Sequence, residues 1–297
     1  MSELRLTVGL PGSGKSLYAL TLLYMNNYVQ RAGPEWRRIN WDNMRRDRGM
    51  HLRAFNRAEE EVMQKESFHL AETYGKLGLN VIVDNTNLSE NTRNKWKGVA
   101  QRAGMTYNEI HMETSLEECI ENDSKRTGLE QCGRAVIERM ALFNGLIKFS
   151  PSERLILVDM DGTVADCTHR RHFVANGNHD WNSFEGEAIL QDAPKWKIIN
   201  LVRMLAKQGY VPLIVSGRSI DRAGKNTVTW LEKRGVPYRH IFMRNGGDNR
   251  PDNIIKKEIL DKLPRDQITY VLDDRDQVVK MWRENGLTCL QVAEGNF

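Results

Sequence analysis

Residues 9–16 have the types and the spacing of a loop that binds the phosphates of a nucleotide. They read GLPGSGKS, a complete G-x-x-x-x-G-K-S pattern. In such a loop the glycines let backbone N–H groups surround the phosphates, the lysine reaches the β- and γ-phosphates, and the serine can bind Mg²⁺. An apolar stretch at 4–8 precedes the loop and a helical pattern at 15–28 follows it, which is the context that the pattern requires. We therefore expect ATP or another NTP to be bound by Gly9, Gly12, Ser13, Gly14, Lys15 and Ser16.

Four charged residues further along could turn nucleotide binding into phosphoryl transfer. Asp42 suits a general base for an attacking hydroxyl, and Arg45 could hold a phosphate of the acceptor. Asp84 ends the apolar stretch 79–83, where a Mg²⁺-binding acid of a P-loop enzyme belongs. Arg126 lies at the end of a predicted helix and could close over the nucleotide. Without the P-loop, a weak surface ion pair for Asp42 and Arg45, and a favourable helix-terminal charge for Arg126, would be the simpler explanations.

A second group of acids lies after the apolar stretch 155–158 and reads DMDGT, from Asp159 to Thr163. The spacing suits an aspartyl-phosphate mechanism. The first carboxylate, Asp159, can attack phosphorus and form an acyl phosphate. The second, Asp161, can protonate the leaving oxygen and then activate water. Two nearby acids also suit Mg²⁺, so we expect both to bind the metal.

Three later features could complete this second site. Ser216, with Gly217 and Arg218 after it, ends a predicted strand and can donate to a phosphoryl oxygen. Lys256 lies on a predicted helix at 252–262 and can hold the same phosphate. The acids Asp273 and Asp274 end a strand and can complete the metal site. Each feature alone has an ordinary explanation as a turn, a solvent-facing lysine or a helix cap, but together at successive element ends they indicate a phosphatase.

The pattern of elements predicts how these residues are positioned. Strand-like and helix-like segments alternate in both halves, which predicts an α/β fold with parallel sheets and helices on both faces. Active sites in such sheets lie at the carboxyl ends of the strands, where both motifs fall. The short breaker FSPSE at 149–153 separates the halves. We therefore expect a P-loop domain over 1–150 and a Rossmann-like domain over 151–297, whose DMDGT motif resembles that of haloacid dehalogenase-type phosphatases.

Composition limits the class of protein. Hydrophobic residues make up 40% and charged residues 28%, no apolar run is long enough to span a membrane, and no signal peptide is apparent. The four cysteines form no C-x-x-C pair, so a reduced, cytoplasmic protein is expected. Net charge is only +4, yet eight arginines lie between 31 and 57. Such a stretch could hold phosphates, but a solvated helix face explains it as well.

These motifs resemble the bacteriophage family of bifunctional polynucleotide kinase/phosphatases over nearly the whole chain. The likeness includes the P-loop, an N-x-D-x-x-R motif at Asn40 to Arg45, a T-N loop at Thr86 and Asn87, and a lid arginine at Arg126. It also includes the DxDGT motif and the closing DDRDQVV segment at 273–279. On the phosphatase side, the resemblance implies substrate-phosphate contacts by Thr163, Arg170, Ser216, Gly217, Arg218, Arg244 and Asp252, with Asp248 and Lys256 in the same motif.

The sequence departs from this family at three places. In some members the acid before T-N stands at Asn85, whereas here it is Asp84, so either residue could be the working one. Some members carry a second lid arginine where this chain has Asn122. The segment 164–193 is poorly anchored by motif, and the likeness suggests that it forms a phosphatase flap.

The resemblance implies two reactions on RNA or DNA ends. The kinase would move the NTP γ-phosphate to a 5'-hydroxyl, with Mg²⁺ as cofactor. The phosphatase would remove a 3'-phosphate, and the likeness extends to opening a 2',3'-cyclic phosphate. Both products are ends that a ligase can seal, and a homo-oligomer is compatible with the likeness. Two alternatives stay open: a metabolite kinase fused to a small-molecule phosphatase, and a nucleic-acid tethering protein with inactive domains.

Overall fold

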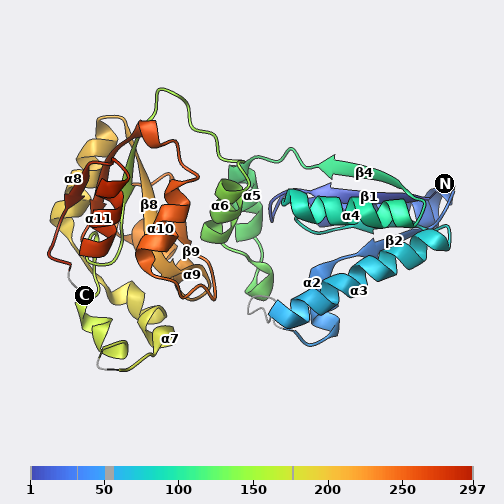
Figure 1. The fold of residues 1–297 in the computed structure, drawn as a ribbon, viewed down its shortest axis with the longest axis horizontal. Helices are drawn as coiled ribbons and strands as arrows, with labels where there is room; N and C mark the ends of the chain where they lie inside the picture. The colour runs from blue at the N-terminus through green and yellow to red at the C-terminus, as the bar shows by residue number, and fades with distance from the viewer. Residues whose placement is uncertain (1, 32, 51–56, 176, 296–297) are drawn as a thin grey trace. The chain divides into compact units, whose positions relative to one another are not determined.

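A computed structural model describes residues 2–31, 33–50, 57–175 and 177–295 (Figure 1). The chain divides into two compact units, Met1–Cys132 and Gly133–Phe297. Each unit contains its own sheet and its own hydrophobic core, and each is described by itself below.

The N-terminal unit is built on a four-stranded sheet with the order β2-β3-β1-β4. Its strands are β1 (Glu3–Val8), β2 (Trp36–Ile39), β3 (Asn80–Val83) and β4 (Thr106–His111), and every pair is parallel. This confirms the expected parallel sheet. The strands β2 and β4 were not predicted, because β2 is rich in arginine and no residue of β4 is fully buried, so neither has a hydrophobic signal.

Helices cover this sheet and carry its functional loops. They are α1 (Lys15–Tyr24), α2 (Trp41–Asp47), α3 (Arg57–Lys76), α4 (Glu90–Arg102) and α5 (Leu116–Ser124), with a 3-10 turn at Gly128–Glu130. The helix expected at 15–28 is α-helical only to Tyr24 and continues as a π-helical segment, Met25–Gln30. Two asparagines accompany this change. Asn26 donates to the Leu22 carbonyl, and Asn27 both donates to and accepts from the backbone of Trp36.

The C-terminal unit is built on a five-stranded parallel sheet with the order β11-β10-β5-β8-β9. The strands are β5 (Arg154–Val158), β8 (Tyr210–Ser219), β9 (His240–Arg244), β10 (Ile268–Asp273) and β11 (Cys289–Gln291). A small antiparallel pair, β6 (Ala165–Asp166) and β7 (Ala193–Pro194), brackets the segment that was poorly anchored by motif. That segment contains a 3-10 helix at Thr168–Phe173, α7 (Trp181–Phe184) and a 3-10 helix at Glu187–Gln191.

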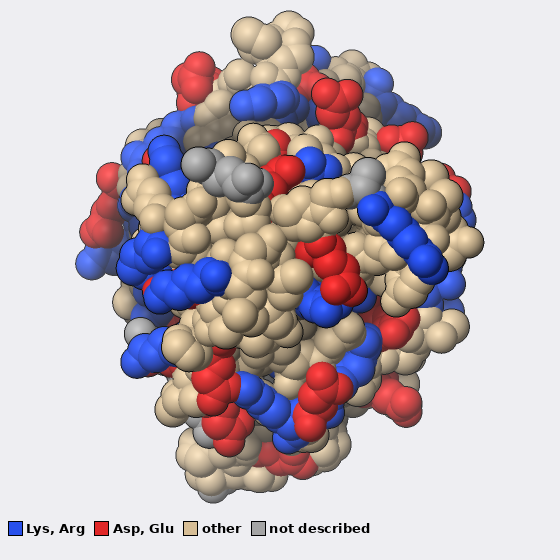
Figure 2. Space-filling model, turned by 90° about the vertical axis from the view of Figure 1, so that its right-hand side faces the viewer, with Lys and Arg blue, Asp and Glu red and all other residues tan. Residues whose placement is uncertain are grey.

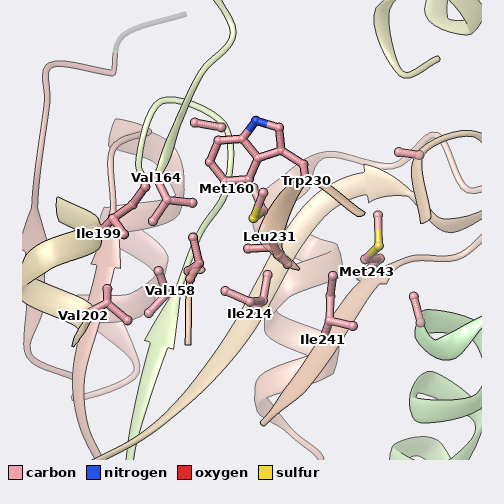
Figure 3. Close-up of a cluster of buried hydrophobic side chains, with 14 of the residues drawn as sticks. Val158, Met160, Val164, Ile199, Val202, Ile214, Trp230, Leu231, Ile241 and Met243 are labelled. Atoms are coloured by element: carbon pink, nitrogen blue, oxygen red, sulfur yellow. The ribbon is translucent and has the colours of Figure 1, made fainter. Parts of the chain in front are cut away.

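Successive side chains along the strands of this unit point to opposite faces of the sheet, and each face carries its own hydrophobic core. Ile156 and Val158 lie in the core that includes Trp230 and Leu231 of α9 (Ile220–Lys233) (Figure 3). Leu155 and Leu157 lie in the opposite core, which α10 (Asp252–Leu260) and α11 (Asp276–Glu284) cover. The helix α8 (Trp196–Lys207) contributes Ile199 and Val202 to the first core. Each fully buried aliphatic or aromatic side chain stabilises the fold by about 1.5–3 kcal/mol, so the strands that end at the site are firmly held.

The division between the units falls earlier than the boundary expected after residue 150. Helix α6 (Arg134–Phe143) packs on β9 and α9, with Ala135 in one core of the C-terminal unit and Leu142 in the other. Its buried Glu138 accepts a hydrogen bond from the Ile241 backbone at 2.7 Å. The breaker at 149–153 therefore lies between two elements of the same compact unit. Sequence pattern could not show this, because an amphipathic helix does not reveal which sheet it covers.

Within the described ranges, no helix has both the length and the apolar character that crossing a lipid bilayer requires.

Candidate active sites

The loop between β1 and α1 has the backbone form that a phosphate cradle requires. Gly12 and Gly14 have φ angles of 84° and 88°, which glycine adopts without strain. A Cβ atom at Gly12 would also overlap the carbonyl of Cys119. The Lys15 ammonium lies in the loop and donates to the Leu10 carbonyl at 2.6 Å and to Ser13 Oγ at 3.3 Å. The predicted loop residues are therefore together, at the carboxyl end of a central strand.

Asp84, which was predicted as a metal-binding acid, lies beside the P-loop serine. Ser16 Oγ donates to Asp84 Oδ1 at 3.3 Å. The other carboxylate oxygen accepts from Arg38 Nε at 3.0 Å and from Asn40 Nδ2 at 3.3 Å. The neighbouring Asn85 accepts from the Trp41 backbone instead, so Asp84 is the residue whose side chain contacts Ser16. A hydroxyl and a carboxylate are ligands that suit Mg²⁺ in a P-loop site.

Burial changes the acid–base properties of Lys15. Removal from water lowers its pKa to about 8, and the nearby Asp84 carboxylate only partly opposes this. A bound triphosphate would add negative charge next to the ammonium and raise the pKa again. The side chain is thus prepared for an anionic ligand.

Asp42 and Arg45 form the pair that the sequence suggested. Asn40 caps α2 by accepting from the Asn43 backbone, which places Asp42 in the first turn. Arg45 Nη1 donates to Asp42 Oδ1 at 2.6 Å, and Arg45 Nε donates to Glu60 Oε1 of α3 at 2.6 Å. The Asp42 side chain is 61% exposed, so its carboxylate is accessible to an acceptor from solvent.

The arginine-rich stretch is not an uninterrupted basic surface. Within the described residues, five of its arginines each contact an acid: Arg37 with Glu35, Arg38 with Asp84, Arg45 with Glu60, Arg46 with Glu130 and Arg48 with Glu66. Arg53 and the side chain of Arg57 lie outside the described residues. Figure 2 likewise shows a face of the molecule on which basic side chains lie among acidic ones.

The candidate lid follows α5, which begins with the predicted capping box of Ser115 and Glu118. Arg126 is half-exposed, with its Nη1 3.8 Å from Asp123 Oδ1. Asn122, which stands where some members of the resembled family have a second lid arginine, donates to the Gly12 carbonyl at 3.1 Å. Residue 122 thus ties α5 to the P-loop backbone.

In the C-terminal unit, Lys256 joins the predicted nucleophile to the acids at the end of β10. Its ammonium lies 2.7 Å from Asp159 Oδ1, 2.8 Å from Asp273 Oδ2 and 3.5 Å from Asp252 Oδ2. Burial by itself would lower the pKa of Lys256, but Asp159, Asp252 and Asp273 outweigh it and raise the pKa well above the usual value. Lys256 is therefore a fixed positive charge beside Asp159.

Three buried carboxylates, Asp159, Asp273 and Asp274, form a group that could hold a metal ion, with oxygens within 4.8 Å of one another. Burial and the neighbouring acids raise the pKa of Asp159 despite Lys256, and raise that of Asp274 to about 6. A single lysine does not balance this negative charge, whereas a divalent cation would. Gly162 is needed next to the group, because a Cβ there would overlap the Asp274 carboxylate. The donor set fits Mg²⁺.

Asp161, which was also predicted as a metal ligand, makes contacts of another kind. Its side chain lies outside the carboxylate group and contacts two arginines, Arg170 and Arg218, with Arg218 Nε 2.9 Å from Asp161 Oδ2. Burial acts to raise the pKa of Asp161, but Arg218 and Arg170 outweigh it and lower the pKa below the usual range. Each guanidinium presents several donors in one plane and so draws the carboxylate away from the acidic group.

Asp192 was missed by sequence reasoning. It is fully buried and accepts from Arg170 Nε at 2.7 Å, from Arg218 Nη2 at 2.8 Å and from His169 Nε2 at 2.9 Å. It therefore fixes both arginines that hold Asp161. No signal could have identified it, because it is a lone acid in a segment without a motif.

These groups line a cavity of about 590 Å³. Its lining includes Asp159, Asp161, Ser216, Gly217, Arg218, Arg244, Asp252, Lys256, Asp273 and Asp274. Within the described residues, the buried hydroxyl of Thr163 has no hydrogen-bond partner. Arg244 holds loop carbonyls, at 2.6 Å from Gly217 O and 3.1 Å from Asp248 O. Arg170 does not appear in the lining and reaches the cavity through Asp161.

Two family models match this chain, one over each half. Residues 153–297 match the family model "Polynucleotide kinase PNKP phosphatase domain", and residues 4–143 match the model "AAA domain". The phosphatase match begins just before β5 and includes all the residues of the C-terminal site. The match to the AAA model ends at residue 143 and therefore includes α6, although α6 belongs to the C-terminal compact unit.

One curated relative and two solved structures are similar to this chain. A protein of Autographa californica nuclear polyhedrosis virus, described as "Putative bifunctional polynucleotide kinase/RNA ligase", is 26% identical over 308 residues. The match covers 95% of this chain but only 41% of that protein. The structure of the Pnkp1/Rnl/Hen1 RNA repair complex has a chain 27% identical, with 100% of this chain and 97% of that chain covered and a TM-score of 0.42. The Mycobacterium tuberculosis APS kinase CysC is 22% identical over 42% of this chain and 69% of that chain, with a TM-score of 0.35.

Proposed function

We propose that this chain repairs nucleic-acid ends with two activities. The N-terminal unit transfers the γ-phosphate of ATP or another NTP to a 5'-hydroxyl, and the C-terminal unit removes a terminal 3'-phosphate. The observation that carries this proposal is the pair of complete sites, each at strand ends, in a chain whose C-terminal half matches the phosphatase domain of a polynucleotide kinase. The products, a 5'-phosphate and a 3'-hydroxyl, are the ends that a ligase joins.

In the kinase reaction, Lys15 and the loop N–H groups hold the triphosphate, and Ser16 and Asp84 hold Mg²⁺. The metal supplies charge neutralisation for the transferred phosphoryl group. Asp42 accepts the proton of the attacking 5'-hydroxyl, and Arg45 binds the acceptor phosphate nearest to it. Arg126 closes over the nucleotide from the lid. The exposure of Asp42 and the rigid support of Arg45 by Glu60 favour these roles.

In the phosphatase reaction, Asp159 attacks phosphorus and forms an acyl phosphate while the bond to the 3'-oxygen breaks. Asp161 gives a proton to that oxygen and later takes one from the water that hydrolyses the acyl phosphate. Lys256, Ser216 and Thr163 bind phosphoryl oxygens, and Asp159, Asp273 and Asp274 hold Mg²⁺, which screens the substrate charge.

The arginines explain how Asp161 can acquire its proton. Without substrate, Arg170 and Arg218 keep the pKa of Asp161 low. An entering phosphate competes with Asp161 for the Arg218 guanidinium, which lines the cavity, and its own negative charge also raises the pKa of the acid. We propose RNA ends as the main substrate, and the same centre could open a 2',3'-cyclic phosphate.

The rival function is a metabolite kinase joined to a small-molecule phosphatase. One observation favours it: five arginines of the basic stretch are each paired with an acid, which reduces the free positive surface for a long acceptor. The two functions differ in the number of phosphates that the kinase must contact.

The test is to compare kinase acceptors at several salt concentrations. We expect the KM for a 5'-hydroxyl oligonucleotide to rise with salt. The slope of log affinity against log salt concentration should be about −1.5 to −2, which corresponds to two or three single-strand phosphate contacts. The KM for a nucleoside 3'-monophosphate should respond less. Phosphate release from a 3'-phosphorylated oligonucleotide should accompany kinase activity in the same preparation. Equal KM values for both acceptors, independent of salt, would reject the polynucleotide function.

A further inference from the structure

The wall of the phosphatase cavity contains two aromatic side chains that the reaction does not use. Trp181 and Phe184, both on α7, line the same cavity as Asp159 and Lys256. The two rings meet edge to face, with centroids 5.7 Å apart and planes at 89°. Trp181 is 45% exposed, so its indole is not merely a member of the core. An exposed aromatic ring beside a phosphate-processing centre is able to stack on a flat apolar group of the substrate.

Contacts at both ends of α7 hold this pair in place. At the start of the helix, Asp180 accepts a hydrogen bond from the Ser183 backbone at 3.0 Å. After the helix, the buried Glu185 accepts from the Ser219 backbone at 2.8 Å and from Arg222 Nε at 2.6 Å. A fixed aromatic surface loses little conformational entropy when a ligand stacks on it.

Arg170 connects the aromatic pair to the reacting groups. The Arg170 guanidinium lies 4.3 Å from the centroid of the Phe184 ring, and its Nη1 donates to the Phe184 carbonyl at 2.9 Å. Another nitrogen of this guanidinium contacts Asp161. The position of the aromatic pair is thereby fixed relative to the proton donor, and a substrate stacked on it would be aligned with the centre.

The size and charge of the cavity suit a nucleotide better than a phosphate alone. Its volume of about 590 Å³ exceeds what a phosphate group needs, and Arg171, Arg250 and Arg275 also line it. A nucleic acid would satisfy both features, because its base can stack on a ring while its backbone phosphates lie near arginines. The base face is common to all four nucleotides, so such stacking tolerates any sequence.

We infer that Trp181, supported by Phe184, is a stacking subsite for the nucleobase of the nucleotide that carries the 3'-phosphate. The inference rests on the proposed 3'-phosphatase function and adds the group that the enzyme recognises. It makes Trp181 a specificity residue that distinguishes a nucleotide end from a simple phosphate ester.

The experiment compares Trp181→Ala and Trp181→Phe with Trp196→Ala. Trp196 is a matched control, because it is 47% exposed on the same unit and lies outside the cavity lining. Three substrates are used: an oligonucleotide with a 3'-terminal phosphorylated nucleotide, the same oligonucleotide with an abasic terminal nucleotide, and glycerol 2-phosphate. We expect Trp181→Ala to raise the KM for the normal oligonucleotide by about 5- to 150-fold, the usual effect of losing one stacked base, with kcat nearly unchanged.

The other arms identify the cause of any change. Trp181→Ala should not alter the KM for the abasic oligonucleotide or for glycerol 2-phosphate, Trp181→Phe should recover most of the affinity, and Trp196→Ala should behave like wild type. Wild type itself should prefer the normal over the abasic substrate by a similar factor, which tests the subsite without any mutation. Equal use of both substrates by wild type, or an equal effect of Trp181→Ala on both, would overturn the inference while the 3'-phosphatase function stands. If folded wild type releases phosphate from neither oligonucleotide, the proposed phosphatase function fails, and the stacking subsite fails with it.

Discussion

Lys15 is subject to two opposing effects in the P-loop. Its function requires a positive charge next to phosphates, but burial lowers its pKa to about 8 from the usual value of 10.5. Between these two pH values the unfolded chain binds more protons at this residue than the folded protein does. Stability from this group therefore rises as the pH increases from about 8 to 10.5, and the charged form weakens the nucleotide-free fold at lower pH. Binding of a triphosphate reverses this preference.

This leads to a prediction about proton uptake. At pH 8 about half of the Lys15 side chains are neutral in the free protein, so ATP binding should take up roughly half a proton, and more at pH 8.5. At pH 6.5 the uptake at this residue should nearly disappear. Calorimetric titration with ATP in two buffers of different ionisation enthalpy measures the uptake directly. Lys15→Met, which cannot titrate, serves as the control, and an uptake that persists in this variant would assign the proton to another group.

At the scale of elements, the parallel strands bring distant residues to one edge of the C-terminal sheet. β5 ends before Asp159, β8 carries Ser216 near its end, and β10 ends at Asp273. The carboxyl ends of parallel strands lie at the same edge, so three residues far apart in sequence meet there. Helix α6 supports this arrangement, because Glu138 accepts from the backbone of β9 and pairs with Arg134 and His240.

Removal of the Glu138 carboxylate should weaken the C-terminal unit selectively. Glu138→Ala leaves the Ile241 N–H without its partner, so we expect the free energy of unfolding of this unit to fall by about 2–4 kcal/mol. Glu138→Gln keeps an acceptor oxygen and should cost less. The measurement is residual phosphatase and kinase activity across a urea series. A parallel loss of both activities at lower urea would show that α6 supports the two units equally.

At the scale of the whole molecule, the contacts described for each site come from that site's own unit. The P-loop partners lie between Gly9 and Asn122, whereas the partners of Asp159 and Asp161 lie between Arg170 and Asp274. The two chemistries also share no residue. Loss of one reactive group should therefore leave the opposite site intact.

Single substitutions should separate the two activities. Lys15→Ala should lower kinase activity by at least about 100-fold, because it removes the ammonium group that stabilises the negative charge of the transferred phosphate. The phosphatase rate should stay unchanged. Asp159→Asn should eliminate the phosphatase, because an amide cannot form the acyl phosphate, and should leave phosphorylation unchanged. Both rates are measured on one oligonucleotide with a 5'-hydroxyl and a 3'-phosphate. Loss of phosphorylation in folded Asp159→Asn protein would contradict the independence of the sites.

The sequence determined the features that are local or periodic. The P-loop is contiguous, so its glycines and Lys15 could be assigned directly, and alternation of strands and helices predicted both parallel sheets. The tendency of active sites to lie at element ends predicted that Asp159, Lys256 and Asp273 meet, and the fold brings their side chains into contact. The parallel sheets and these contacts are present in the fold because a regular period carries its own geometry, and the nucleotide-binding role of the P-loop residues stays a prediction.

Tertiary structure decided the features that depend on which distant groups meet. Asp161 was expected to bind metal, but Arg170 and Arg218 hold it, and Asp192 fixes both arginines although no motif marks it. The packing of α6 on the C-terminal unit was equally invisible in the chain. Buried charges must find partners wherever the fold brings them, because leaving one unpaired costs several kcal/mol. That requirement selects partners by three-dimensional proximity, which neither residue type nor spacing encodes.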